Sequence, residues 1–244
     1  DLVTTLPNKN TSKKKLQKDM RYRLRRTLAL CDRVVASTQP LADELSMYCA
    51  DIVVVPNCID LARWEMIEPQ VNTGNKLRVG WAGGQYHSGD LDIILEVVKE
   101  TAEEVDWIFM GMCPEELKPY IHEYHDFSSF HDYPERLASL NLDLAVAPLE
   151  MHPFNEAKSN LRLLEYGMLA WPVICTDIYP YQSNNPPVVR VNNTKAEWLE
   201  AIRSAIAQPE QLQGKGQALR SWVLDHYILD QNKERWLNAL TVKI

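Results

Sequence analysis

Short apolar runs alternate with helical stripes of apolar residues through most of this 244-residue chain. In the larger part of it, the runs that predict strands are residues 77–82, 107–111, 127–133, 143–149, 172–177 and 188–191. Between them, apolar residues recur at helical spacing, as in Leu91, Ile94, Leu95 and Val98. Strands that alternate with helices form a parallel sheet covered on both faces. The pattern therefore predicts an α/β fold with a doubly wound, Rossmann-like parallel sheet.

The amino-terminal stretch carries a smaller pattern of the same kind. Residues 12–31 suit a helix with one narrow apolar stripe, and residues 33–38 and 52–57 suit two strands with a helix between them. A doubly wound sheet has about five or six strands, so two are too few. The chain also begins at Asp1. We therefore expect a fragment, and the remainder of a longer parent chain as its partner.

These patterns divide the chain into four parts. The expected parts are the end of an amino-terminal α/β domain (1–60), a linker (61–75), a Rossmann-like domain (76–226) and a terminal helix (227–244) returning to the amino-terminal part.

Composition narrows the class of protein. A hydrophobic content of 45% and a charged content of 24% are typical of a globular protein. No apolar run approaches the roughly 18 residues that span a bilayer. The five cysteines are scattered without CxxC spacing, which argues against a zinc site or a disulfide framework. We expect reduced thiols and a cytoplasmic protein.

The charge is unevenly distributed. The net charge is −7, but residues 1–30 carry +7, which leaves −14 for the rest. An acidic body argues against a nucleic-acid-binding protein. The basic residues 9–26 could bring the protein to the inner face of a membrane, although a solvated helix face is the simpler interpretation.

One stretch, residues 154–177, carries the strongest candidate chemistry. It is expected to form a loop, a helix that Ser159 or Asn160 can cap, a tight turn and a buried strand. A helix amino terminus presents free N–H groups to a phosphate, and Lys158 directly before it adds a positive charge. Glu165, further along this helix, could accept two hydrogen bonds from a ribose diol. An ordinary helix with a solvated lysine remains the alternative.

A glycine-rich loop follows the strand at residues 77–82. Gly83 and Gly84 are placed where open α/β sheets cradle phosphates, although the loop has neither the Walker A nor the GxGxxG pattern. His87 is the only candidate phosphate partner in this loop. A solvated surface histidine is the alternative.

Two motifs resemble one enzyme family. The segment Val55-Pro56-Asn57-Cys58-Ile59-Asp60 resembles the Val-Pro-Asn-x-Val-Asp element of GT-B retaining glycosyltransferases (family 4-like, group 1), the large group that includes glycogen and sucrose synthases. Glu165 followed by Trp171-Pro172-Val173-Ile174 resembles the second half of that family's Glu-x7-Glu element and the strand after it. The resemblance covers roughly residues 31–240.

The sequence departs from that family at two points. The first Glu of the Glu-x7-Glu element is Ala157 here, with Glu156 displaced by one position. The Arg and Lys that commonly hold the diphosphate in the glycine-rich loop are also absent.

The resemblance implies the carboxyl-terminal, donor-binding domain of a glycosyltransferase. The implied reaction moves a sugar from a nucleoside-diphosphate sugar, expected to be a UDP-sugar, to a glycan, lipid or protein acceptor, as in polysaccharide biosynthesis. It implies retention and no metal or other cofactor. The implied nucleotide-sugar-binding residues are Gly83, Gly84, His87, Tyr133, Lys158, Ser159, Asn160, Leu161 and Glu165. Lys158 and His87 are expected to be catalytic, by stabilising charge that develops on the diphosphate leaving group.

Two other functions stay open. One is a degenerate nucleotide-sugar-binding or scaffolding module without turnover. The other is a sugar-nucleotide 2-epimerase, for which the expected acidic and histidine constellation is missing. If the chain is a transferase fragment, we expect it to bind the donor and to transfer the sugar slowly or not at all.

Overall fold

The structure is a computed structural model that describes residues 5–7, 20–68, 72–84 and 87–241. Its strands are β1 (Val34–Ala36), β2 (Ile52–Val54), β3 (Arg78–Ala82), β4 (Asp106–Met110), β5 (Glu123–His125), β6 (Leu144–Ala147), β7 (Val173–Thr176) and β8 (Val189–Val191). Its α-helices are α1 (Met20–Leu28), α2 (Gln39–Leu45), α3 (Ser88–Asp92), α4 (Leu95–Thr101), α5 (Tyr133–Ala138), α6 (Pro153–Glu156), α7 (Leu161–Met168), α8 (Tyr179–Gln182), α9 (Lys195–Ala207), α10 (Leu212–His226) and α11 (Leu229–Leu240). Short 3-10 helices are η3 (Leu61–Arg63), η4 (Glu115–Tyr120) and η5 (Pro209–Gln211).

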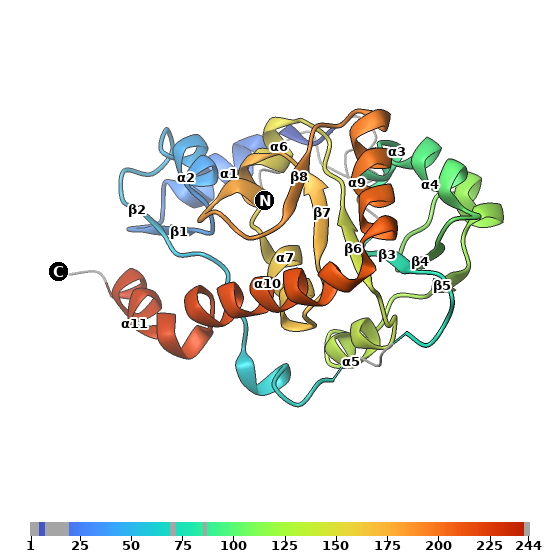
Figure 1. The fold of residues 1–244 in the computed structure, drawn as a ribbon. Helices are drawn as coiled ribbons and strands as arrows, with labels where there is room; N and C mark the ends of the chain where they lie inside the picture. The colour runs from blue at the N-terminus through green and yellow to red at the C-terminus, as the bar shows by residue number, and fades with distance from the viewer. Residues whose placement is uncertain (1–4, 8–19, 69–71, 85–86, 242–244) are drawn as a thin grey trace.

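The centre of the molecule is a six-stranded parallel sheet with the order β5-β4-β3-β6-β7-β8 (Figure 1). The strand order reverses between β3 and β6, which are hydrogen-bonded neighbours. Such a reversal is the point at which doubly wound sheets open a crevice at the carboxyl ends of their strands. The doubly wound parallel sheet predicted from the apolar pattern is confirmed.

Both faces of the sheet are covered by helices. Side chains alternate along each strand, so Val79 and Trp81 face one layer while Ala82 faces the other. The first layer contains α4 and α9, and the second contains α5, α7 and α10. Because the central strands are buried on both faces, their sequences are continuous apolar runs.

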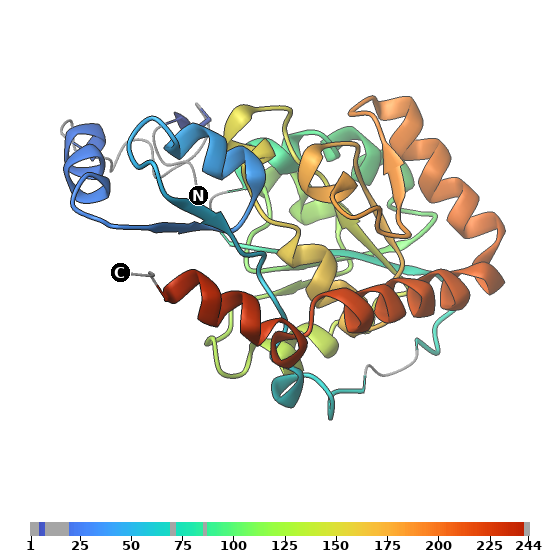
Figure 2. The same cartoon turned by 90° about the vertical axis from the view of Figure 1, so that its left-hand side faces the viewer.

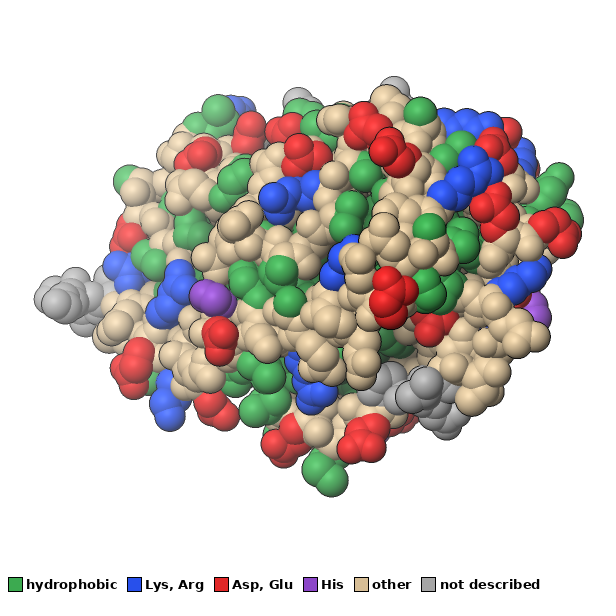
Figure 3. Space-filling view, in the orientation of Figure 1, with side chains coloured by type: hydrophobic (Ala, Val, Ile, Leu, Met, Phe, Trp, Pro, Cys, Tyr) green, Lys and Arg blue, Asp and Glu red, His purple; other side chains and the backbone are tan. Residues whose placement is uncertain are grey.

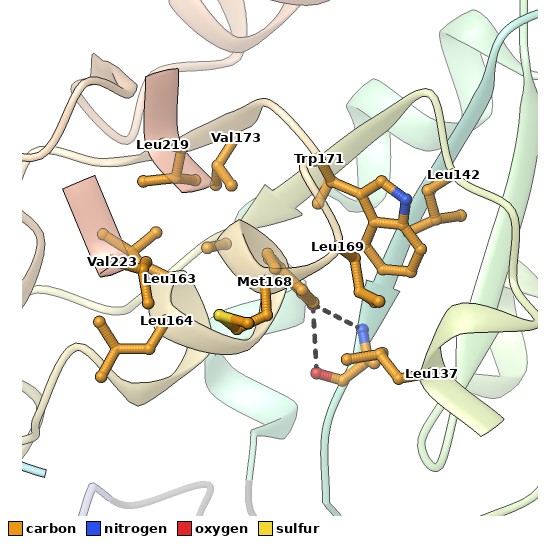
Figure 4. Close-up of a cluster of buried hydrophobic side chains, with 14 of the residues drawn as sticks. Leu137, Leu142, Leu163, Leu164, Met168, Leu169, Trp171, Val173, Leu219 and Val223 are labelled. Atoms are coloured by element: carbon orange, nitrogen blue, oxygen red, sulfur yellow. Dashed lines mark hydrogen bonds between the residues drawn. The ribbon is translucent and has the colours of Figure 1, made fainter. Parts of the chain in front are cut away.

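The core around α7 fixes the orientation of that helix. Figure 4 shows apolar side chains of α7, among them Leu163, Leu164 and Met168, packed against α10 and the sheet. The hydroxyl of Tyr166 accepts a hydrogen bond from the N–H of Ala82, at 2.9 Å, so α7 is tied directly to the end of β3. Helix α10 approaches closely because Gly216 has no side chain; an added Cβ would lie 1.8 Å from the carbonyl oxygen of Ala170.

The amino-terminal part lies beside this domain as a two-stranded parallel sheet, β1 and β2, with α2 (Figure 2). It contacts the segment before α7: the Thr38 hydroxyl donates to the Ala157 carbonyl at 2.8 Å, and Asn57 donates to Ser159 at the same distance. Arg33 donates to backbone carbonyls at the end of α11. The amino-terminal part is therefore in contact with the end of the last helix.

The strand predicted at residues 127–133 is wrong. The third strand of the domain is β5, which precedes that stretch, and residues 127–132 form a loop that leads into α5. Phe127 and Phe130 are 61% and 81% exposed, so this apolar segment lies on the surface. Strand β5 lies at the edge of the sheet and has a polar sequence. Its Glu123 is paired with Arg78 of β3. Because β5 contains no apolar run, the hydrophobic pattern did not predict it.

Two helices also differ from the prediction. The apolar spacing of Leu91, Ile94, Leu95 and Val98 predicted one helix, but these residues belong to two helices, α3 and α4, and the segment between them. Of the helix predicted over residues 12–31, residues 20–28 form α1, and residues 12–19 lie outside the described part. The apolar stripe predicted for this helix includes Leu16 and Leu28. Leu16 lies outside the described part, and Leu28 is buried. Among the described residues, none of the helices has the length and apolar character that crossing a membrane requires.

Candidate functional site

A cleft of about 270 Å³ opens at the carboxyl ends of β3 and β6, where the strand order reverses. Its lining combines the glycine pair after β3, the loop after β5 and the first two turns of α7. The lining residues are Ala82, Gly83, Gly84, His87, Phe127, Tyr133, Leu149, Lys158, Ser159, Leu161, Arg162, Glu165 and Tyr181. The cleft is thus placed where open α/β sheets bind their ligands.

Eight of the nine expected binding residues line this cleft. The exception is Asn160, which is buried and lines a neighbouring hollow instead. It occupies the position before α7, but its side chain does not cap the helix. Ser159 does not cap the helix either; its hydroxyl oxygen accepts a hydrogen bond from Asn57. Neither predicted cap is therefore formed, and the first turn of α7 keeps N–H groups without a side-chain cap.

Lys158 is held at the front of α7 by a carboxylate. Its Nζ lies 3.6 Å from Oδ2 of Asp90 and 4.9 Å from the ring centre of Phe154. The side chain is only 15% exposed. Burial lowers the pKa of Lys158 to about 8, because desolvation disfavours the charged form more than Asp90 favours it. Lys158 is therefore mostly charged at neutral pH, at a site where water screens it poorly.

Asp90 is the buried anchor of this cluster. One carboxylate oxygen accepts hydrogen bonds from the N–H of Glu150, at 2.8 Å, and from the side chain of Asn155, at 2.9 Å. The other lies 2.7 Å from Nδ1 of His87. Burial acts to raise the pKa of Asp90, but His87 and Lys158 outweigh it and hold the pKa below its usual value. Asp90 is thus a fixed negative charge that positions both neighbours.

The hydrogen bonds of His87 define its tautomer. Its Nε2 lies 3.4 Å from Nη2 of Arg162, which can only donate, so Nε2 accepts. Nδ1 then carries the proton and donates to Asp90. Burial, together with the charge of Arg162, lowers the pKa of His87 to about 4. His87 is neutral at pH 7, and both ring nitrogens are engaged within the protein.

Arg162 is a cleft residue that the sequence reasoning missed. It lies in the first turn of α7, and its guanidinium carbon is 5.1 Å from the ring centre of Trp81. One guanidinium nitrogen lies beside Gly83, where an added Cβ would approach it to 2.7 Å. A signal was available: a cation is unfavourable at a helix amino terminus unless an anion is nearby. With Lys158, Arg162 supplies the positive charge absent from the glycine-rich loop.

At the other end of the cleft, Glu165 pairs with Tyr133. The Tyr133 hydroxyl donates to Oε2 of Glu165 at 3.0 Å. Burial raises the pKa of Glu165 to about 7, although Tyr133 and Arg162 partly oppose this shift. The exposed ring of Phe127 forms another part of the wall, near Gly84.

The acidic residues near the cleft include Glu156 and an Asp-x-Asp pair. Glu156, the displaced partner of the Glu-x7-Glu element, is exposed and does not line the cleft. The sequence also contains one Asp-x-Asp pair, Asp90 and Asp92, in α3, which the sequence reasoning overlooked. Asp90 is occupied by the contacts above, and no group of three or more His, Cys, Asp or Glu suited to a metal ion occurs in the part of the chain that the structure describes.

Comparison with known proteins gives a structural likeness only. No protein-family model and no curated protein matches the sequence. Among solved structures, TarM covers 98% of this chain with a TM-score of 0.71 and 13% identity. HepE from Anabaena, in complex with UDP and glucose, covers 97% with a TM-score of 0.70 and 11% identity. Sucrose-phosphate synthase from Thermosynechococcus elongatus covers 95% with a TM-score of 0.67 and 14% identity.

The matched regions are parts of longer proteins. This chain spans 49% of TarM, 64% of the sucrose-phosphate synthase and 70% of HepE. Identities this low establish the fold and leave the chemistry to be argued from the residues of the cleft. The chain therefore has the fold of the GT-B glycosyltransferases, as its sequence motifs implied.

Proposed function

We propose that this chain is the donor-binding part of a glycosyltransferase that uses a nucleoside-diphosphate sugar, with UDP as the nucleotide. The observation that carries the proposal is the pair of cations Lys158 and Arg162, which line the same cleft as the glycine pair Gly83–Gly84 at the switch point of the sheet. Arg162 lies directly beside Gly83. HepE, which has the same fold, is described in complex with UDP-glucose. In this proposal, residues 1–60 belong to the acceptor side and residues 76–226 hold the donor.

The diphosphate would lie between the glycine pair and the first turn of α7. The absence of a side chain at Gly83 lets Trp81 and Arg162 pack against the backbone there, because an added Cβ would meet the Trp81 ring at 2.5 Å and Arg162 at 2.7 Å. Lys158 offers a point charge, whereas Arg162 offers a planar fork that matches phosphate oxygens. Free N–H groups of α7 add donors.

The nucleoside would extend toward Glu165. A carboxylate can accept hydrogen bonds from both ribose hydroxyls, and Tyr133 fixes its orientation through the 3.0 Å hydrogen bond. The exposed ring of Phe127 offers a stacking surface for the base.

The same residues would promote transfer. When the bond between the sugar and the diphosphate breaks, negative charge grows on the diphosphate, and Lys158 with Arg162 would stabilise it in a partly buried site. His87 would act by orienting Arg162, since it is neutral and engaged on both nitrogens. Retention at the sugar and a metal-independent reaction are parts of this proposal.

A second candidate is nucleotide-sugar binding without turnover. The observation that favours it is Ala157, which stands where the resembling family has its sugar-contacting Glu, while Glu156 is exposed outside the cleft. Transfer measured in a longer protein that contains this chain separates the two candidates.

Calorimetric titration tests the donor site. We expect UDP and one UDP-sugar to bind, and UMP to bind more weakly because it lacks the second phosphate. Lys158→Ala should weaken UDP binding about tenfold or more, since a lost charge-assisted contact costs ~1.5–3 kcal/mol. Lys118→Ala, which removes an exposed lysine outside the cleft, is the matched control. Equal UDP affinity in Lys158→Ala and Lys118→Ala would remove Lys158 from the site.

A further inference from the structure

The linker that follows β2 lies against the larger domain. Its 3-10 helix η3 begins at Asp60, whose side chain caps it. Trp64 and Ile67 are buried in the same core as the apolar side chains of α7, whereas Met66 is 85% exposed. Figure 3 shows hydrophobic and acidic side chains at the lower edge of the molecule, where Figure 1 places the linker and α5. The linker is therefore anchored to the core by one side only.

Arg63 reaches from the anchored linker to the loop of residues 127–132, whose Phe127 lines the cleft. Its Nη2 donates a hydrogen bond to the carbonyl oxygen of Phe130 at 2.6 Å. Its guanidinium carbon also lies 4.2 Å from the centre of the Phe130 ring, where the negative face of the ring attracts a cation. Arg63 thus holds Phe130 by both its backbone and its side chain.

The loop of residues 127–132 is poorly packed. Each of its residues is exposed or only partly buried, and Phe130 is 81% exposed. Inside the loop, the Ser129 hydroxyl donates to the Asp132 carboxylate at 2.7 Å, which closes a turn without joining it to the core. Beside the loop, a hollow of about 570 Å³ lies between the linker and α5. The contacts with Arg63 therefore tie this loop to the buried side of the linker.

The same loop leads directly into the pair that faces the ribose in the proposed site. Tyr133, the first residue of α5, follows the loop and donates to Glu165 at 3.0 Å. The charge of Arg63 also acts on Glu165: with Tyr133 and Arg162, it opposes the rise that burial causes in the pKa of this carboxyl. Arg63 thus favours the charged form of Glu165, in which both oxygens accept hydrogen bonds.

We propose that Arg63 is a positioning residue of the donor site, which fixes the loop of residues 127–132 and keeps Tyr133 and Glu165 arranged for the ribose hydroxyls. The linker is then a part of the donor-binding unit, which begins before residue 76. This inference rests on the proposed function, because that function assigns the ribose to Glu165.

Discrimination at the ribose tests the proposal, because it isolates the contact made by Glu165. The probes are UDP and 2′-deoxy-UDP, which lacks one of the two ribose hydroxyls. At pH 7 we expect the wild-type protein to prefer UDP about tenfold, since one hydrogen bond to a charged group is lost in the deoxy form. Arg63→Gln should reduce this preference about threefold or more. Arg136→Gln, which removes an exposed cation of α5 outside the cleft, should leave it unchanged.

A double variant separates this role from a merely structural one. A general loosening of the fold would weaken UDP and 2′-deoxy-UDP alike and leave their ratio unchanged. If Arg63 acts through Glu165, Arg63→Gln should cause no further loss of preference in a protein that already carries Glu165→Gln.

A measurement without nucleotide tests the contact with the loop. Chymotrypsin cleaves after aromatic residues, and exposed loops that are loosely held are its preferred sites. We expect cleavage after Phe127 or Phe130 to be about threefold faster in Arg63→Gln than in Arg136→Gln.

Three results would overturn the proposal: an unchanged preference for UDP in Arg63→Gln, a further loss of preference when Arg63→Gln is added to Glu165→Gln, or equal cleavage rates in Arg63→Gln and Arg136→Gln. Failure of the wild-type protein to bind UDP would instead contradict the proposed donor site. The cleavage comparison would still decide whether Arg63 holds the loop, since it needs no nucleotide.

Discussion

In the proposed donor site, Glu165 would combine recognition of the ribose with an electrostatic cost to folding. Its folded pKa of about 7 lies above its ordinary value of 4.5, so the folded protein binds this proton more tightly than the unfolded chain does. The contribution to stability is therefore fully present below pH 4.5 and is lost as the pH rises through about 7. At pH 8 the carboxylate is charged, which suits a ribose but disfavours folding.

Replacing Glu165 with Gln should separate these two effects. At pH 8 we expect UDP binding to weaken at least fivefold, because one acceptor oxygen is lost. We expect the free energy of unfolding to stay equal or rise by roughly 1–2 kcal/mol, because the buried charge is gone. Calorimetry and thermal unfolding on the same sample measure both. Intact UDP binding together with a lower unfolding temperature would make Glu165 a structural residue.

Lys158 should make binding at the proposed donor site depend on pH. Its pKa of about 8 means that the free protein loses this charge as the pH rises, and binding a diphosphate must then take up a proton. We expect UDP affinity to fall about five- to tenfold between pH 7.5 and 9.

Lys158→Arg is the matched variant, because arginine stays charged over this range. Its UDP affinity should change little between the same two pH values. If the wild-type protein and Lys158→Arg lose affinity equally, another group is responsible for the pH dependence.

At the scale of elements, the glycine pair after β3 offers a paired test. An added Cβ at Gly83 would meet the ring of Trp81, which is fully buried and cannot move aside. At Gly84 the nearest atom is 4.0 Å away, on Phe127. Gly83→Ala should therefore displace Arg162, weaken UDP binding about tenfold and cost roughly 1–3 kcal/mol of stability. Gly84→Ala should leave both within about twofold and ~0.5 kcal/mol. Similar UDP affinities for the two variants would contradict this geometry.

Elements with a strong local signal were predictable, and elements that depend on their neighbours were not. The central strands are apolar throughout because both faces are buried, and α9 is capped by Thr194, a residue type that is favoured at helix starts. Strand β5 was missed because an edge strand needs no apolar run, and its Glu123 is stabilised by Arg78 from another strand. The aromatic residues Phe127 and Phe130, which are exposed in a loop, led to the wrong prediction of a strand at residues 127–133.

At the scale of the whole molecule, the proposal makes a prediction about turnover. In the described residues the amino-terminal part contributes a two-stranded sheet, whereas the sheet of the larger domain has six strands. Closing two domains on both substrates supplies much of the rate of such reactions, because it holds the reactants together and excludes water. We expect this chain to bind a UDP-sugar and to transfer the sugar far below the ~1 s⁻¹ of ordinary enzymes.

Analysis of the products formed from a UDP-sugar measures this transfer, and calorimetry on the same sample shows whether the proposed donor site is intact. A longer protein containing these residues should be active. Transfer by the 244-residue chain at ordinary enzymatic rates would show that the acceptor site is complete within it, and that the proposed domain boundary is wrong.

The apolar pattern and the order of the strands along the chain were sufficient to predict the parallel sheet and the position of the cleft. Parallel strands end at one edge, so chain order alone brings the glycine pair, Lys158 and Glu165 together. The tertiary structure decided the rest: Arg162 turned toward Trp81, His87 neutral between Asp90 and Arg162, and Arg63 of the linker in contact with Phe130. These features depend on contacts between residues distant in sequence and on burial, which a local pattern of apolar and polar positions does not contain.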